Sequence, residues 1–70
     1  MEVTVKVRYG CSKSMIENFG NNRYLVYLLS LKEDGDAMAE LKTILSRNIG
    51  IPAGRIELKR ETEKELVFII

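Results

Sequence analysis

A single segment of this sequence has the apolar spacing of an α-helix, which limits how any sheet in the chain can be covered. Between Asp34 and Gly50 the apolar residues fall on one helical stripe, at Ala37, Met38, Leu41, Ile44, Leu45 and Ile49. Asp34 or Asp36 can cap the first turn, and Glu40 lies near the positive end of the helix dipole. Gly50 suits the left-handed position that ends a helix, and Pro52 prevents continuation. One helix can cover only one face of a sheet.

Four segments have the patterns of β-strands. Over residues 2–8 Val3, Val5 and Val7 alternate with polar residues, the period of a strand with one buried and one solvated face. The segment from Arg23 to Leu31 is apolar at both parities, which is typical of a strand covered on both faces. Residues 55–60 alternate again, residues 66–70 are apolar at both parities, and the charged residues between them predict a hairpin. The predicted element order is β-β-α-β-β.

The segment between the first two predicted strands is long for so small a domain. It runs from Tyr9 to Asn22 and is rich in Gly, Ser and Asn, so we predict a loop. Met15, Ile16 and Phe19 are its only large apolar side chains and its candidate anchors to the core. Loops of this length are often functional, but an irregular connection held by those three side chains is the favoured interpretation.

The burial patterns also predict the strand order. The two alternating strands, 2–8 and 55–60, tolerate water on one face, whereas 23–31 and 66–70 prefer central positions. We therefore predict an α+β two-layer sandwich over residues 1–70, with an antiparallel four-stranded sheet of order 1-2-4-3 and one helix on one face. A β-grasp arrangement is the structural alternative. It places the first strand in the centre, where its polar side chains Thr4, Lys6 and Arg8 are poorly suited.

Composition argues against several classes of function. Eleven Lys and Arg against ten Asp and Glu give a net charge of +1, which disfavours a general nucleic-acid binder. Without histidine or a Cys-x-x-Cys motif, we expect no metal and no cofactor. The longest apolar run, 66–70, is too short to span a membrane. Because Cys11 is the lone cysteine and the N-terminal residues form no apolar signal core, we expect a cytoplasmic protein.

No catalytic residue is predicted. Glu61, Glu63 and Glu65 share one strand parity, but a solvated hairpin tip explains them better than an acid/base pair. Cys11 lies near Lys13 in the long loop, where it could act as a nucleophile. No base partner for the thiol can be identified. An enzyme acting through residues 9–22 remains an alternative.

Several short features of the sequence form a recognisable combination. They are Val7 through Ile16 with Lys13 inside it, Gly20 and Arg23, Asp34-Gly35 followed by Ala37, Leu41 and Leu45, Gly50-Ile51-Pro52, and Glu61-Thr62. From Val5 to Ile70 the chain resembles the YggU-like family of small uncharacterised proteins, a domain-of-unknown-function family. The resemblance implies a two-layer α+β sandwich with an antiparallel sheet in the order given above. It also implies a small residue at the position of Cys11, so we interpret this cysteine as structural. It implies no activity, since none is established for the family. The family usually continues into a second helix, which we expect to be missing because the sequence ends at Ile70.

The best functional lead is a surface. With one helix on one face, the other face of the predicted sheet would carry an apolar stripe made of Leu25, Tyr27, Leu29, Val67 and Ile69. It would be flanked by Thr4, Lys6, Arg8, Glu57 and Lys59. A hydrophobic centre with a charged rim is typical of interfaces, and monomers rarely expose such a patch. We therefore predict a non-enzymatic protein-interaction module that forms a homodimer or docks another protein.

Two other interpretations of that face stay open. Single-stranded RNA could cross the sheet, with Tyr27 stacking on a base and four cations holding phosphates, namely Lys6, Arg8, Arg23 and Lys59. A single aromatic is fewer than such platforms normally use. Alternatively, residues 9–22 could fold under the sheet and cover the stripe.

Overall fold

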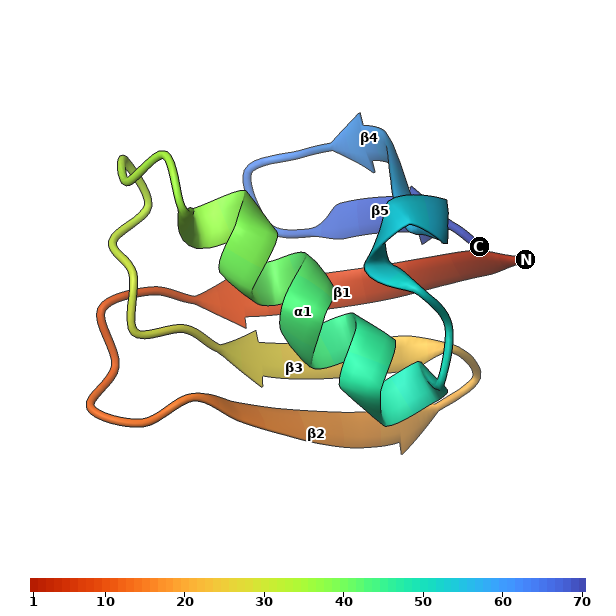
Figure 1. Ribbon diagram of the computed structural model, residues 1–70, viewed down its shortest axis with the longest axis horizontal. Helices are drawn as coiled ribbons and strands as arrows, with labels where there is room; N and C mark the ends of the chain where they lie inside the picture. The colour runs from red at the N-terminus through yellow and green to blue at the C-terminus, as the bar shows by residue number, and fades with distance from the viewer.

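A computed structural model describes residues 1–70 as five strands and one α-helix (Figure 1). The strands are β1 (Glu2–Arg8), β2 (Met15–Gly20), β3 (Arg23–Tyr27), β4 (Glu57–Glu61) and β5 (Leu66–Ile69). Helix α1 spans Ala37–Ile49, and a short 3-10 turn, η1, spans Ala53–Arg55. The α+β class and the single helix on one face of the sheet are confirmed. The prediction of four strands, all antiparallel, is wrong.

The strands form one mixed sheet in the order β2-β3-β1-β5-β4. β1 lies at its centre, parallel to β3 and antiparallel to β5. β2 pairs with β3, and β4 with β5, in antiparallel hairpins. The C-terminal hairpin was predicted, although β4 begins at Glu57 because the residues before it form η1. For the four strands that were predicted the order is 2-1-4-3, so the predicted order 1-2-4-3 is wrong.

The first strand can be central because α1 covers only one face of the sheet (Figure 1). Val3 and Val5, which face the helix, are 1% and 0% exposed. Thr4 and Lys6 alternate with them and point to the other, solvated face. The alternation of apolar and polar residues therefore indicates that one face of the strand is solvated. It does not indicate that the strand lies at the edge of the sheet. The central position is the one that the β-grasp alternative assigned to this strand.

The segment between β1 and β3 contains a strand, so the prediction of a continuous loop there is wrong. β2 reverses into β3 through Asn21 and Asn22, whose φ angles are 52° and 59°. Positive φ at both central residues is the geometry of a type I′ hairpin turn, which matches the twist of paired strands. Ile16 packs against the core as predicted. Met15 and Phe19 are 48% and 62% exposed and do not anchor the segment.

This additional strand explains why β1 and β3 are parallel. After β1 the chain passes the end of the sheet, returns as the edge strand β2, and reverses into the space between them (Figure 1). Backbone hydrogen bonds extend the pairing beyond the strand ends. The Leu28 N–H donates to the Arg8 carbonyl at 2.8 Å, and the Cys11 N–H donates to the Leu28 carbonyl at 2.8 Å.

The core lies between α1 and the sheet. Its buried side chains are apolar and come from every layer: Val3, Val5, Val26, Leu28, Ala37, Leu41, Leu45, Ile56, Leu66 and Phe68. The helix contributes one stripe, as the spacing of its apolar residues predicts. Burying a large aliphatic side chain of this kind stabilises a fold by about 1.5–3 kcal/mol. α1 lacks the length and the apolar composition needed to cross a membrane.

The ends of α1 follow the sequence signals in part. Gly50 adopts the left-handed conformation with φ 84°, and its N–H donates to the Ser46 carbonyl at 2.8 Å, as predicted for the C-cap. Asp36 occupies the N-cap but makes no side-chain capping bond. The Asp34 carboxylate instead accepts a hydrogen bond from the Leu31 N–H at 2.8 Å.

β3 ends at Tyr27, four residues before the predicted boundary at Leu31. The reason is a change of hydrogen-bond partner. The N–H groups of Leu29 and Ser30 donate to the two carboxylate oxygens of Glu40, at 2.9 and 3.1 Å. They are therefore taken out of the sheet and tied to the first turn of α1.

Candidate functional site

The sheet face turned away from α1 is called the open face here. Residues paired in register share a face, and side chains alternate along each strand. The register therefore places these residues together on the open face: Glu2, Thr4, Lys6, Arg8, Met15, Glu17, Arg23, Leu25, Tyr27, Glu57, Arg60, Val67 and Ile69.

The apolar stripe predicted for this face is divided into two parts by β1. Lys6 lies opposite Leu25, and Arg8 lies opposite Tyr27, in the β1–β3 register. On the other side of β1, Thr4 lies opposite Val67. The prediction of a hydrophobic centre with a charged rim is therefore wrong. It assumed that the second and fourth predicted strands were neighbours, whereas the polar side chains of β1 lie between them.

The predicted stripe residues differ in exposure. Leu25 and Tyr27 are half-buried, whereas Val67 is only 3% exposed and offers little contact area. Ile69 is 41% exposed at the other side of the face. Leu29 lies beyond the end of β3, in the connection to α1, and is not part of the sheet.

A charged pair lies at the β4 side of the open face. Lys59 is located at an irregularity in the β4–β5 register between Leu58 and Arg60. Its ammonium group donates a hydrogen bond to the Glu2 carboxylate and forms an ion pair with it. This hydrogen bond and the positive charge of Lys59 hold the pKa of Glu2 below its ordinary value of 4.5. Lys59, predicted as part of the charged rim, is therefore already paired with Glu2.

Tyr27 occupies the other side of the face, between β1 and β2. Its hydroxyl donates a hydrogen bond to Glu17 at 3.3 Å. Partial burial raises the pKa of Tyr27 first, and the negative charge of Glu17 raises it further. Tyr27 therefore stays protonated at neutral pH and keeps its donor. With Arg8 opposite it, this side of the face combines an aromatic ring, a guanidinium and a carboxylate.

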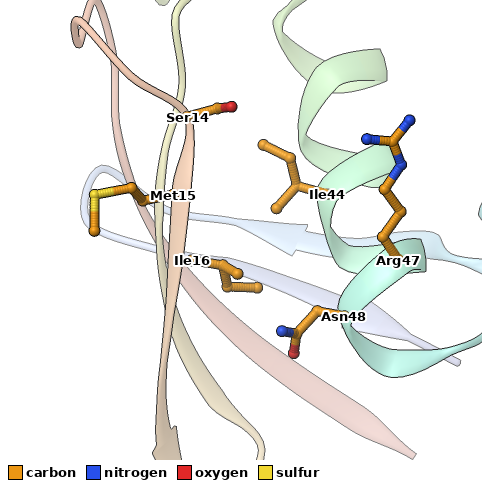
Figure 2. Close-up of a pocket in the computed structure, with 6 residues that line it drawn as sticks. All are labelled: Ser14, Met15, Ile16, Ile44, Arg47 and Asn48. Carbon is orange, nitrogen blue, oxygen red and sulfur yellow. The ribbon is translucent and has the colours of Figure 1, made fainter.

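A groove separates the edge strand β2 from the C-terminal half of α1 (Figure 2). Its volume is about 310 Å³, and its lining residues are Ser14, Met15, Ile16, Ile44, Arg47 and Asn48. Ile16 and Ile44 point into it from opposite sides, whereas Met15 points away from the helix (Figure 2). The sequence patterns do not predict this groove because they do not predict β2. The available signal was the Asn21-Asn22 pair, two residues that tolerate positive φ.

The loop around Cys11 was the candidate region for chemistry. The Cys11 thiol contacts the carbonyl oxygens of Arg8 and Tyr9 at 3.5 and 3.8 Å. Both oxygens belong to residues that precede Cys11 closely in the chain, so these contacts are local. No group of three or more Cys, His, Asp and Glu side chains comes together to hold a metal ion.

Comparisons with known proteins return no match, whether against family models, curated proteins or solved structures. The resemblance to the YggU-like family therefore stays a prediction. The mixed sheet with β1 at its centre also differs from the antiparallel sheet that the resemblance implies.

Proposed function

We propose that this protein is a non-enzymatic protein-interaction module that docks through its open face, and that the occupant to test first is a second copy. The supporting observation is that α1 covers one face of the sheet and leaves the other uncovered (Figure 1). Residues 9–22 do not fold under the sheet, because they supply β2 in its plane. The interpretation in which that segment covers the face is therefore wrong.

The residue types on the open face suit a protein contact. Arg and Tyr are enriched in interface cores and among the residues that dominate binding energy, and Arg8 lies directly opposite Tyr27. Met15 and Ile69, 48% and 41% exposed, add apolar area on either side. Half-buried Leu25 completes this surface next to Lys6.

The charges of the open face favour pairing with itself. Both signs are interspersed, with Lys6 and Arg8 on the central strand and Glu17 and Glu57 on the edge strands. A two-fold axis through such a face can bring the cations of one copy over the carboxylates of the other. A YggU-like relationship would leave the proposal unchanged, because that family has no established activity. The lone free cysteine, Cys11, supports a cytoplasmic location.

The first experiment is the mass in solution by light scattering across a dilution series. We expect a dimer that dissociates on dilution, and we expect Leu25→Lys and Ile69→Lys each to weaken it by at least about tenfold, because each buries an unpaired ammonium in the contact. Leu31→Lys is the matched control, since Leu31 is 51% exposed in the β3–α1 connection, outside the sheet. A mass that neither sheet variant changes would contradict docking of a second copy here.

Single-stranded RNA is the second candidate because the structure places Lys6 and Arg8 at the centre of the open face, beside Tyr27. A base could stack on the tyrosine while the two cations hold phosphates. Against this, Lys59 is already paired with Glu2. Fluorescence anisotropy of a labelled uridine oligonucleotide measures this binding. We expect the affinity to fall as the salt concentration rises, and to fall in the Tyr27→Ala and Lys6→Ala variants. Affinity independent of salt would rule this candidate out.

A further inference from the structure

The two edge strands of the sheet are protected to very different degrees. In β4, four of the five residues are charged, at Glu57, Lys59, Arg60 and Glu61, and the register is irregular between Leu58 and Arg60. Charges and bulges at an edge prevent another strand from pairing there. β2 has one charged residue, Glu17, and its irregularity lies next to the turn at its end. Its free backbone N–H and C=O groups are therefore the accessible pairing edge of the sheet.

This edge borders the groove between β2 and α1 (Figure 2). A strand added to β2 would place every second side chain on the helix side of the sheet, directly over the groove. The floor it would meet there is apolar, because Ile16 and Ile44 point into the space from either side (Figure 2). Both are partly buried and packed against the core, so this part of the floor is held in place by core contacts.

Arg47 supplies the charge at the rim of this groove. It is exposed and lies in the last turn of α1. The structure contains a single ion pair, between Lys59 and Glu2, so Arg47 has no carboxylate partner. It is one of the residues that line the groove, and its side chain runs along the outside of the helix (Figure 2). A guanidinium in this position is complementary to a carboxylate on an incoming strand.

We propose that β2 and the adjoining groove bind an extended peptide segment of another protein by strand addition. Main-chain hydrogen bonds to β2 supply the general affinity, as in other cases of added strands. Specificity comes from an apolar side chain over Ile16 and Ile44 and from an Asp or Glu beside Arg47. Side chains two positions apart are the nearest ones that share a face of a strand, so we place these two at that spacing. The recognised pattern is apolar-x-acidic or its reverse.

A second copy of this chain fits the edge less well. In a two-fold pairing of β2 with itself, the helix side of the incoming strand would carry Ile16 and Asn18. Its one carboxylate, Glu17, faces the open side and cannot meet Arg47. The edge site therefore calls for a strand from a different sequence, and it is separate from the open-face contact proposed above.

The experiment is a selection from displayed random peptides of about ten residues, followed by affinity measurements on the selected peptides made synthetically. We expect enrichment of the apolar-x-acidic pattern in either direction, and new hydrogen-exchange protection of β2 amides when a selected peptide binds. Arg47→Glu should weaken that peptide by at least about tenfold, and replacing the acidic residue of the peptide with Lys should restore binding to this variant. Arg47 is exposed, so the variant is expected to fold.

Lys64→Glu is the matched control, an identical reversal of charge in the exposed β4–β5 turn, and it should leave the affinity unchanged. Leu25→Lys on the open face should also have no effect, which separates this proposal from the one above. Three results would overturn it: no enrichment of the pattern, equal affinity for the Arg47→Glu variant, or a dimer in which the β2 amides gain protection without any peptide.

Discussion

At the scale of single residues, Glu40 has a second role besides its favourable interaction with the helix dipole. The sequence places it near the positive end of α1, and the structure adds two hydrogen bonds from the N–H groups of Leu29 and Ser30, at 2.9 and 3.1 Å. One side chain thus satisfies two backbone donors that have left the sheet. The carboxylate joins the end of β3 to the beginning of α1.

This geometry predicts a dependence of stability on pH. The Ser30 side chain and the N–H groups of Leu29 and Ser30 hold the pKa of Glu40 below its ordinary 4.5, against the opposing effect of burial. A carboxyl whose folded pKa is lowered stabilises the fold above its unfolded pKa, and this contribution is lost as pH falls through the folded pKa. Glu40→Gln should therefore cost about 1 kcal/mol at pH 7, and the difference from the unsubstituted protein should shrink below about pH 4.

Urea denaturation at a series of pH values measures this difference. Glu63→Gln is the control, because Glu63 is exposed in the β4–β5 turn and removing its charge breaks no hydrogen bond. If Glu40→Gln and Glu63→Gln have the same free energy of unfolding at pH 7, the assigned role of Glu40 is wrong.

At the scale of elements, the β2–β3 hairpin is the feature that reorganises the sheet. Its turn consists of Gly20, Asn21, Asn22 and Arg23, with positive φ at the two asparagines. The carbonyl of Asn22 also accepts a hydrogen bond from the Thr4 N–H at 2.9 Å. The same turn therefore aligns β3 against β1, and both the parallel pair and the edge groove depend on it.

The turn makes a prediction about substitutions at Asn22, whose φ is 59°. Asn22→Val should lower the free energy of unfolding by about 1–2 kcal/mol, because a β-branched side chain is strained in the left-handed region. Asn22→Gly should be equally or slightly more stable, because Asn-Gly is the preferred type I′ pair. Urea denaturation of the three proteins checks this order. A valine variant as stable as the glycine variant would mean that the chain does not turn here with positive φ.

At the scale of the whole molecule, the strand order decides what the open face can do. The two ends of the chain lie side by side at one end of the inner strands β1 and β5 (Figure 1), where the Ile70 N–H donates to the Met1 carbonyl at 2.9 Å. β1 and β5 are therefore neighbours, and Lys6 and Arg8 come between the two apolar parts of the face. The result is a mixed open face, for which we propose self-association, and an exposed edge at β2, for which we propose strand addition.

The amino-acid sequence dictated the features that depend on neighbours along the chain. These are the helix with its Gly50 stop, the alternation of β1, the C-terminal hairpin and the division of side chains between the two faces. Each follows from local periodicity or backbone preference. The strand β2 was not predicted because its large apolar residues Met15 and Phe19 are exposed, so the segment does not show the alternation of a half-buried strand. The central position of β1 and its parallel pairing with β3 came from tertiary contacts, because alternation along a strand is the same at the edge and at the centre of a sheet with one open face.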